Sequence, residues 1–245
     1  MLAPRYLLRE AVVFDLLDGA PPGSFVEIGC GGGELLVALA RKGFRGIATD
    51  RSGNARRRSR ARLGEEGITT VSIVDELPVG DVFDHVFLFE VLGYAPDPVE
   101  LLATCRELLA PGGRFLVSFA RADSGYASGV VHDMRFFTAD EVTDLARAAG
   151  LVPGRRVNYG YPLANAIVPV RNAIHAARSL LPGHTPTDDS EEKPDTGLDH
   201  ASPWMRPLSL LSNRTTLAPF VRLQSLFART NRGNGYVLEF TRRRH

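Results

Sequence analysis

The stretch Ser24-Phe25-Val26-Glu27-Ile28-Gly29-Cys30-Gly31-Gly32-Gly33 decides the fold of this 245-residue chain. An apolar run of strand length, residues 24–28, passes directly into a cluster of glycines. Residues 34–42 follow with helical apolar spacing, and a second short apolar run, residues 46–49, ends at Asp50. A strand, a glycine turn, a helix and a second strand in this order predict a parallel strand pair joined by a crossover.

The same alternation continues beyond Asp50. Further strands are expected at residues 69–74, 82–89 and 114–120, and helices at residues 54–64, 98–109 and 138–150. Thr138 followed by Glu141 is the capping-box pattern for the start of the last helix. Strands interleaved with helices in this way predict an α/β fold, with an open, mostly parallel sheet covered on both faces.

The pattern changes after Gly150. Strands are expected at residues 151–159 and 235–241, and the residues between them fit no strand–helix unit. Within this stretch we expect a helix over 163–181, a polar loop over 182–203, and one or two helices over 207–230 that Pro219 interrupts. The sequence therefore predicts one domain formed by residues 1–159 and 233–245, with a partly helical insertion at residues 160–232.

Charge and cysteine content exclude several function classes. The chain has 29 basic and 28 acidic side chains, so no global field favours nucleic acid or an anionic membrane surface. The two cysteines, Cys30 and Cys105, are too few for a disulfide scaffold and indicate a reducing, cytoplasmic location. The arginine-rich run 56–62 falls on the second crossover helix, where we expect a solvated face rather than a nucleic-acid site.

The glycine cluster does not fit either common phosphate-binding template. A P-loop ends in Gly-Lys-Ser/Thr, whereas Gly33 is followed by Glu34 and Leu35. The dinucleotide fingerprint would require its third glycine at position 34. Glu34 would instead place a negative charge where a pyrophosphate should lie, so both phosphate hypotheses are disfavoured.

Residues 26–33 instead resemble the first motif of class I S-adenosylmethionine-dependent methyltransferases. Three more segments resemble that family: Val-Asp-Glu-Leu-Pro at 74–78, the apolar run at 83–92, and Leu-Leu-Ala-Pro-Gly-Gly-Arg-Phe at 108–115. The resemblance spans about residues 24–155 and implies a Rossmann-like, seven-stranded, mostly parallel sheet with a final antiparallel strand. It also implies S-adenosylmethionine as the cofactor.

The resemblance assigns roles to particular residues. The glycine loop would hold the methionine end of the cofactor, and the carboxylate of Asp50 would accept both ribose hydroxyls. The implied cofactor residues are Glu27, Gly29, Cys30, Gly31, Asp50, Arg51, Asp75, Glu76, Leu88 and Phe89. Two positions depart from the family pattern: Ile73 stands where the adenine-side acid is common, and Tyr94 stands where histidine is common after the fourth strand.

His132 and Tyr94 are the candidate catalytic residues. His132 lies between the fifth strand and the next helix, in a loop that covers the methyl group in this family. A neutral imidazole there could take a proton from the acceptor, although a loop histidine bonded to backbone remains an equal alternative. No metal site is expected, because the acidic run 188–192 lacks ligand spacing and only Glu90 follows the fourth strand.

The expected function is methyl transfer to a small-molecule acceptor, such as an oxygen or nitrogen atom of a natural product or a sugar. The insertion would cover the acceptor, and a homodimer through the same apolar faces is the alternative. Two other functions remain open. The cofactor-binding fold could catalyse a non-methylating rearrangement or cyclisation, or it could be a non-catalytic scaffold.

Overall fold

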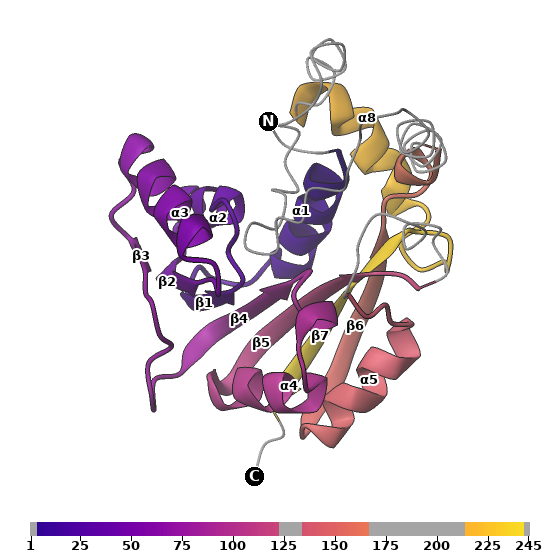
Figure 1. Cartoon of the computed structure of the whole chain (residues 1–245). Coiled ribbons are helices and arrows are strands. Elements are labelled where there is room, and N and C mark those ends of the chain that lie inside the picture. Colours follow the sequence, from indigo (N-terminus) through magenta and orange to yellow (C-terminus); the bar gives the residue numbers. More distant parts are fainter. Residues whose placement is uncertain (1–3, 123–133, 167–213, 243–245) are drawn as a thin grey trace, which may run out of the picture.

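The computed structural model describes residues 4–122, 134–166 and 214–242 (Figure 1). The described strands are β1 (Ser24–Ile28), β2 (Arg45–Thr49), β3 (Val71–Ile73), β4 (Phe83–Phe89), β5 (Leu109–Ala120), β6 (Leu151–Tyr159) and β7 (Gly235–Arg242). The described helices are α1 (Pro4–Leu17), α2 (Glu34–Arg41), α3 (Gly53–Glu65), the short 3-10 helix η1 (Leu92–Tyr94), α4 (Pro98–Glu107), α5 (Ala139–Ala148) and α8 (Arg214–Ser225).

The strands form one seven-stranded sheet in the order β3-β2-β1-β4-β5-β7-β6. β1 pairs in parallel with both β2 and β4, and β4 pairs in parallel with β5. β7 runs antiparallel to its neighbours β5 and β6. The expected mostly parallel sheet with a final antiparallel strand is therefore confirmed. The strand order reverses between β1 and β4, and the crevice at such a reversal is where open α/β sheets bind ligands.

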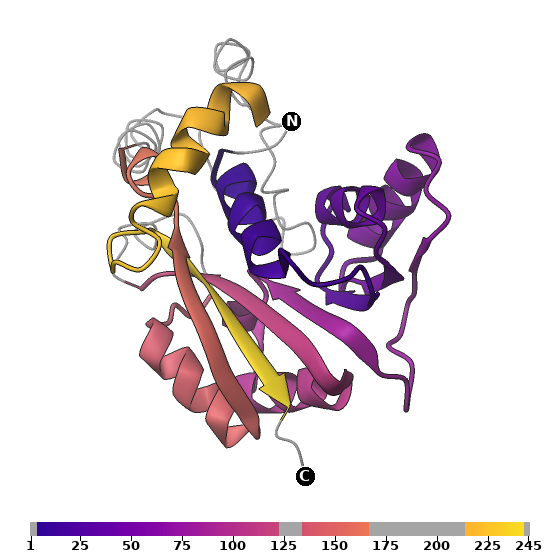
Figure 2. The same ribbon diagram turned by 180° about the vertical axis from the view of Figure 1, so that it is seen from behind.

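Alternate residues along the strands pack into two apolar cores, one on each face of the sheet. On β4, Val86 and Leu88 belong to the core shared with α4 and α5, whereas Phe87 and Phe89 belong to the core shared with α1 and α2. The views in Figures 1 and 2 show these helix pairs on opposite faces of the sheet. Burial on both faces explains why β4 has such a continuous apolar sequence.

Most of the expected elements agree with the structure to within a few residues, including the capping box formed by Thr138 and Glu141. The expected start of the strand at 114–120 is wrong, because β5 begins at Leu109, where the expected helix was to end. The expected interruption at Pro219 is wrong, because α8 runs through this residue from Arg214 to Ser225. The carbonyl that loses its donor is that of Thr215, which is an exposed residue, so water can replace the missing bond.

The insertion begins and ends at one edge of the sheet. Tyr159 closes β6 and Gly235 opens β7, and these two residues lie opposite each other in the β6–β7 pair. Residues 163–166 are helical, as expected, whereas the rest of the expected helix over 163–181 and the expected loop over 182–203 lie outside the described residues. None of the described helices has the length and apolar character needed to cross a bilayer.

Candidate functional site

Four loops meet at the carboxyl edge of the parallel strands. The glycine loop follows β1, Asp50 follows β2, Asp75 follows β3 and Glu90 follows β4. The loops after β1 and β4 lie in contact, because a Cβ atom added to Gly29 would lie 2.1 Å from Cγ2 of Val91. The side chains of this edge therefore form one candidate site at the point where the strand order reverses.

The glycine loop leaves an open space beside Gly31. Gly29, Gly31 and Gly33 all have positive φ values, of 84°, 55° and 78°. The backbone N–H groups of Gly29 and Cys30 donate to the carbonyl of Thr49 at 2.8 and 3.1 Å, which fixes the loop against the end of β2. A Cβ added at Gly31 would meet no atom within 4 Å, so the loop presents bare backbone there.

Asp50 joins the end of β2 to this loop. Its Oδ2 accepts a hydrogen bond from the Gly31 N–H at 3.0 Å, and its Oδ1 accepts one from the Ser52 N–H at 2.9 Å. Each carboxylate oxygen keeps a second lone pair for another donor. The orientation of the Asp50 carboxylate is thus fixed by backbone before any ligand arrives.

Glu27 is a buried acid beside the glycine loop. Only 4% of the residue is exposed, and its Oε2 has no hydrogen-bond partner among the described residues. Burial raises the pKa of Glu27 to about 8, and the negative charges of Glu34 and Asp50 add to this rise, against the effect of Arg9. An unpartnered buried carboxyl oxygen at this position fits the ammonium group of an amino-acid ligand.

The other residues expected to bind the cofactor occupy varied positions. Cys30 is buried with its Sγ 3.5 Å from Oγ of Ser59, and burial raises the pKa of its thiol to about 12. Arg51 and Glu76 are exposed. Asp75 is exposed too, and its Oδ1 accepts hydrogen bonds from Nε of Arg56 at 2.9 Å and from a terminal nitrogen of Arg60 at 2.8 Å. Those hydrogen bonds and charges, from Arg60 above all, lower the pKa of Asp75.

The residues expected after β4 are only partly brought to the site. Leu88 is fully buried in the core, so a contact with a ligand would have to come from its backbone. Phe89 is buried against Phe87, and Tyr94 ends η1 with its N–H donating to the carbonyl of Val91 at 2.9 Å. His132 lies outside the described residues. In the portions of the chain that the structure describes, no three His, Cys, Asp or Glu side chains are grouped to hold a metal ion.

Glu90 is the centre of a partly buried polar cluster that the sequence did not predict. It has a φ of 60°, and its carboxylate accepts hydrogen bonds from Arg5 at 3.2 Å, from Oη of Tyr159 at 2.8 Å and from Oγ of Ser118 at 3.1 Å. Arg9 lies 3.6 Å from the same carboxylate. Burial alone would raise the pKa of Glu90, but the positive charges of Arg5 and Arg9 outweigh it and lower the pKa.

The comparison with known proteins identifies the family. A family model described as a methyltransferase domain matches residues 4–153. The chain belongs to the class I S-adenosylmethionine-dependent methyltransferases. The expectation drawn from the sequence motifs is therefore confirmed.

Curated relatives include ubiquinone biosynthesis O-methyltransferases. One from Cereibacter sphaeroides (strain ATCC 17025) is 33% identical over 147 residues, which cover 52% of this chain and 60% of the relative. One from Dinoroseobacter shibae is 32% identical over 174 residues, which cover 60% of this chain and 69% of the relative. The match to the Cereibacter relatives therefore spans only about three fifths of their length.

Solved structures show the same methyltransferase fold. The glycopeptide N-methyltransferase MtfA with bound S-adenosylmethionine has a TM-score of 0.52 and 19% identity, covering 62% of this chain and 85% of that chain. The [4+2]-cyclase SpnF has a TM-score of 0.59 and 15% identity, covering 95% and 81%. A Haloferax volcanii methyltransferase complex with the activator Trm112 has a TM-score of 0.60 and 20% identity, covering 97% and 90%.

Only a weak signal for the Glu90 cluster exists in this methyltransferase's sequence. Arg5 and Arg9 are four residues apart, which places them on the same side of α1. The other two residues that bind Glu90, Ser118 and Tyr159, come from β5 and β6, far away along the chain. Contacts between residues so far apart in the sequence form only when the sheet is assembled, and no local sequence motif predicts them.

Proposed function

We propose that this methyltransferase transfers a methyl group from S-adenosylmethionine to a hydroxyl oxygen of a small-molecule acceptor. The use of S-adenosylmethionine is supported above all by the hydrogen bond from the Gly31 N–H to the Asp50 carboxylate, beside the open space at Gly31. This pairing joins the glycine loop to an oriented acid. The choice of oxygen is supported by the O-methyltransferases among the relatives.

The residues present fit the cofactor group by group. The bare backbone at Gly31 would lie along the methionine end of the cofactor, and the unpartnered Oε2 of Glu27 would accept from the ammonium group of the cofactor. Arg9 would pair through its guanidinium with the carboxylate of the cofactor's methionine end. The charge of the same guanidinium acts to lower the pKa values of both Glu27 and Glu90. Asp50 would accept the ribose hydroxyls, with Arg51, Asp75 and Glu76 on the adenine side. The bound cofactor supplies an electrophilic methyl group.

The task of the chain in such a reaction is mainly orientation. Methyl transfer is an in-line displacement, so alignment and closeness of the two partners account for much of the rate. Glu90 and Tyr94 lie on either side of Val91, which contacts the glycine loop, and this position supports a role for them at the reactive end of the site. We propose Tyr94 as an orienting group for the acceptor and His132 as the base that takes the hydroxyl proton.

The insertion at residues 160–232 is proposed to cover the acceptor. It leaves and returns at the β6–β7 end, and its described helix α8 is tied to α1. Gln224 of α8 donates to the carbonyl of Leu8 at 2.8 Å and accepts from the Gly160 N–H at 3.0 Å, while Arg214 pairs with Glu10 at 2.8 Å. Hydrogen exchange should show protection here when cofactor product and acceptor are both bound. Protection that instead follows protein concentration would make this segment a dimer interface.

The direct test of methyl transfer is product analysis. Purified chain is incubated with S-adenosylmethionine and panels of phenols, sugars and amines, and S-adenosylhomocysteine is measured by mass spectrometry. We expect it to form with a hydroxyl acceptor and to fall in the Asp50→Ala variant. Conversion of an acceptor with no S-adenosylhomocysteine would favour the second candidate, a rearrangement or cyclisation, for which SpnF shows that the fold is suitable. Binding of the cofactor with no conversion of any acceptor would favour a scaffold.

A further inference from the structure

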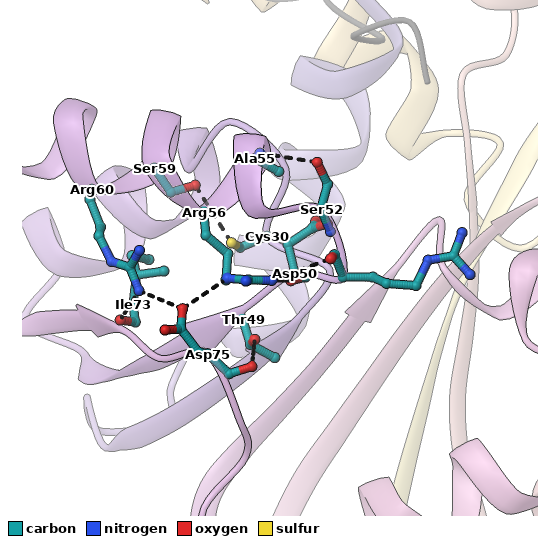
Figure 3. A network of polar contacts seen from close by, with 11 residues as sticks. Cys30, Thr49, Asp50, Ser52, Ala55, Arg56, Ser59, Arg60, Ile73 and Asp75 are labelled. Atoms are coloured by element: carbon teal, nitrogen blue, oxygen red, sulfur yellow. Dashed lines mark hydrogen bonds and ion pairs between the residues drawn. The ribbon is translucent and has the colours of Figure 1, made fainter. Parts of the chain in front are cut away.

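Helix α3 turns one row of polar side chains towards the cofactor loops. Ser52 caps its start by accepting from the Ala55 N–H at 3.3 Å. One side of the helix then carries the polar residues Arg56, Ser59 and Arg60, followed by the apolar Leu63, because these positions recur at helical spacing. The expected solvated face is confirmed for Arg57, Arg58 and Arg60, which are exposed, whereas Arg56 is partly buried and Ser59 is fully buried. Figure 3 shows Arg56 and Arg60 reaching Asp75.

Arg56 connects two loops with one guanidinium. One terminal nitrogen donates to the carbonyl of Asp50 and, at 3.3 Å, to the carbonyl of Arg51. Its Nε donates to Oδ1 of Asp75 at 2.9 Å. The turn after β2, which carries the proposed ribose acid, is thereby held at a fixed distance from the turn after β3.

Arg60 strengthens the same connection. It donates to the carbonyl of Ile73 at 3.2 Å and to the oxygen of Asp75 that Arg56 also uses, at 2.8 Å. Both guanidiniums therefore bind one carboxylate oxygen, Oδ1. The side chain of Asp75 is two-thirds exposed, so these bonds add little to folding stability, but they do fix its direction.

The glycine loop is held from the same helix. The fully buried Ser59 donates from Oγ to the carbonyl of Gly31 at 2.9 Å. Arg62 donates from Nε to the carbonyl of Gly32 at 2.6 Å and pairs with Glu34 at 2.8 Å. The loops after β1, β2 and β3 are therefore all hydrogen-bonded to the single helix α3. In each loop the acceptor is a backbone carbonyl or a carboxylate oxygen.

We propose that α3 is a positioning helix that holds the three loops in their binding arrangement before the cofactor arrives, with Arg56 as its principal positioning residue. This inference rests on the proposed cofactor site. Ordering loops on binding reduces affinity, so a helix that orders them beforehand raises affinity without touching the ligand. Arg56 is the decisive residue because its planar fork spans two loops at once, which a lysine ammonium cannot reproduce.

The test is calorimetric titration with S-adenosylhomocysteine of the unmodified chain and of Arg56→Lys, Arg56→Ala and Arg57→Ala. Arg57 is the matched control, because it is exposed on the same helix and donates a 3.4 Å hydrogen bond to Oδ1 of the neighbouring Asn54, away from the three loops. We expect Arg56→Ala to weaken binding about tenfold, Arg56→Lys to recover little of this, and Arg57→Ala to bind like the unmodified chain. Thermal unfolding should be similar in all four proteins.

Hydrogen exchange separates positioning from general stability. In unliganded Arg56→Lys, exchange should rise in residues 50–52 and 73–76 and return to normal with saturating S-adenosylhomocysteine. If the unmodified chain does not bind S-adenosylhomocysteine, the proposed function fails. If the unmodified chain binds it and Arg56→Lys binds within twofold, or if exchange rises throughout the sheet, the positioning role is overturned while the proposed function stands.

Discussion

The two sides of the carboxyl edge hold their loops in different ways. On the β1–β3 side, the polar contacts join residues 31–75, and most of them start from one helix, α3. On the β4–β6 side, the Glu90 cluster joins α1, β5 and β6 through side chains far apart in the sequence. The first arrangement consists of exposed or partly exposed bonds and should control affinity. The second is a partly buried charge cluster, in which the side chains of Arg5, Arg9 and Glu90 are 18%, 13% and 24% exposed, and its main effect should be on stability.

The largest expected effect concerns the Glu90 cluster. Glu90→Ala leaves the guanidiniums of Arg5 and Arg9 largely buried without their carboxylate, so we expect the free energy of unfolding to fall by about 3 kcal/mol. Urea denaturation measures this change. Glu65→Ala, which removes an exposed acid near the end of α3, should stay within about 0.5 kcal/mol. A loss below about 1 kcal/mol for Glu90→Ala would contradict the contrast between the two sides.

The glycine loop offers the reverse result, a loss of binding with a modest effect on stability. Gly31→Val places a branched side chain in the open space of the loop, and we expect S-adenosylhomocysteine affinity to fall at least about a hundredfold. Gly67→Val is the control, because Gly67 also has a positive φ, of 65°, and open space around it. Both variants should lose about 1–2 kcal/mol of stability from backbone strain. Equal affinities in the two variants would show that the ligand does not cross Gly31.

Asp50 should affect mainly the binding of the cofactor. Asp50→Ala removes the acceptor for the ribose hydroxyls and the partner of the Gly31 N–H, and we expect binding to weaken by about 1.5–3 kcal/mol. Titration calorimetry with S-adenosylhomocysteine measures this difference. Affinity unchanged from that of the unmodified chain would remove Asp50 from the cofactor site.

Glu27 should give the smallest effect, a proton released on binding. Its pKa of about 8 means that the folded chain mostly carries the proton at pH 7. A ligand ammonium favours the ionised carboxylate and lowers this pKa, so a fraction of one proton should leave on binding. Affinity should therefore rise as the pH goes from 6 to 8. Titrations in buffers of different ionisation enthalpy measure the release, which Glu27→Gln should abolish; release that persists in this variant comes from another group.

The sequence was sufficient for the features that depend on neighbouring residues. The glycine loop, Asp50 and the capping box of Thr138 are each set by a few consecutive positions, and the structure contains all three in their expected elements. The alternation of strands and helices also predicted the parallel sheet. Local patterns act on local backbone, which explains why these predictions succeeded.

The remaining features depend on the assembled fold. The arginine run indicated a helix surface, but only the position of α3 beside the loops shows that Arg56 and Arg60 reach Asp75 whereas Arg57 does not. Glu90 was considered only as a possible metal ligand, because its partners Arg5 and Tyr159 reach it through tertiary packing. Pro219 signalled a break, yet the contacts of α8 with α1 retain the helix.

The most direct test of the account is a crystal structure of the chain with S-adenosylhomocysteine. The account predicts that the ribose hydroxyls bond to the Asp50 carboxylate, that the amino-acid end lies along Gly29 to Gly31, and that Arg56 keeps its bonds to Asp50 and Asp75. A ligand bound elsewhere, with the carboxylate of Asp50 beyond hydrogen-bond distance of the ribose, would contradict it.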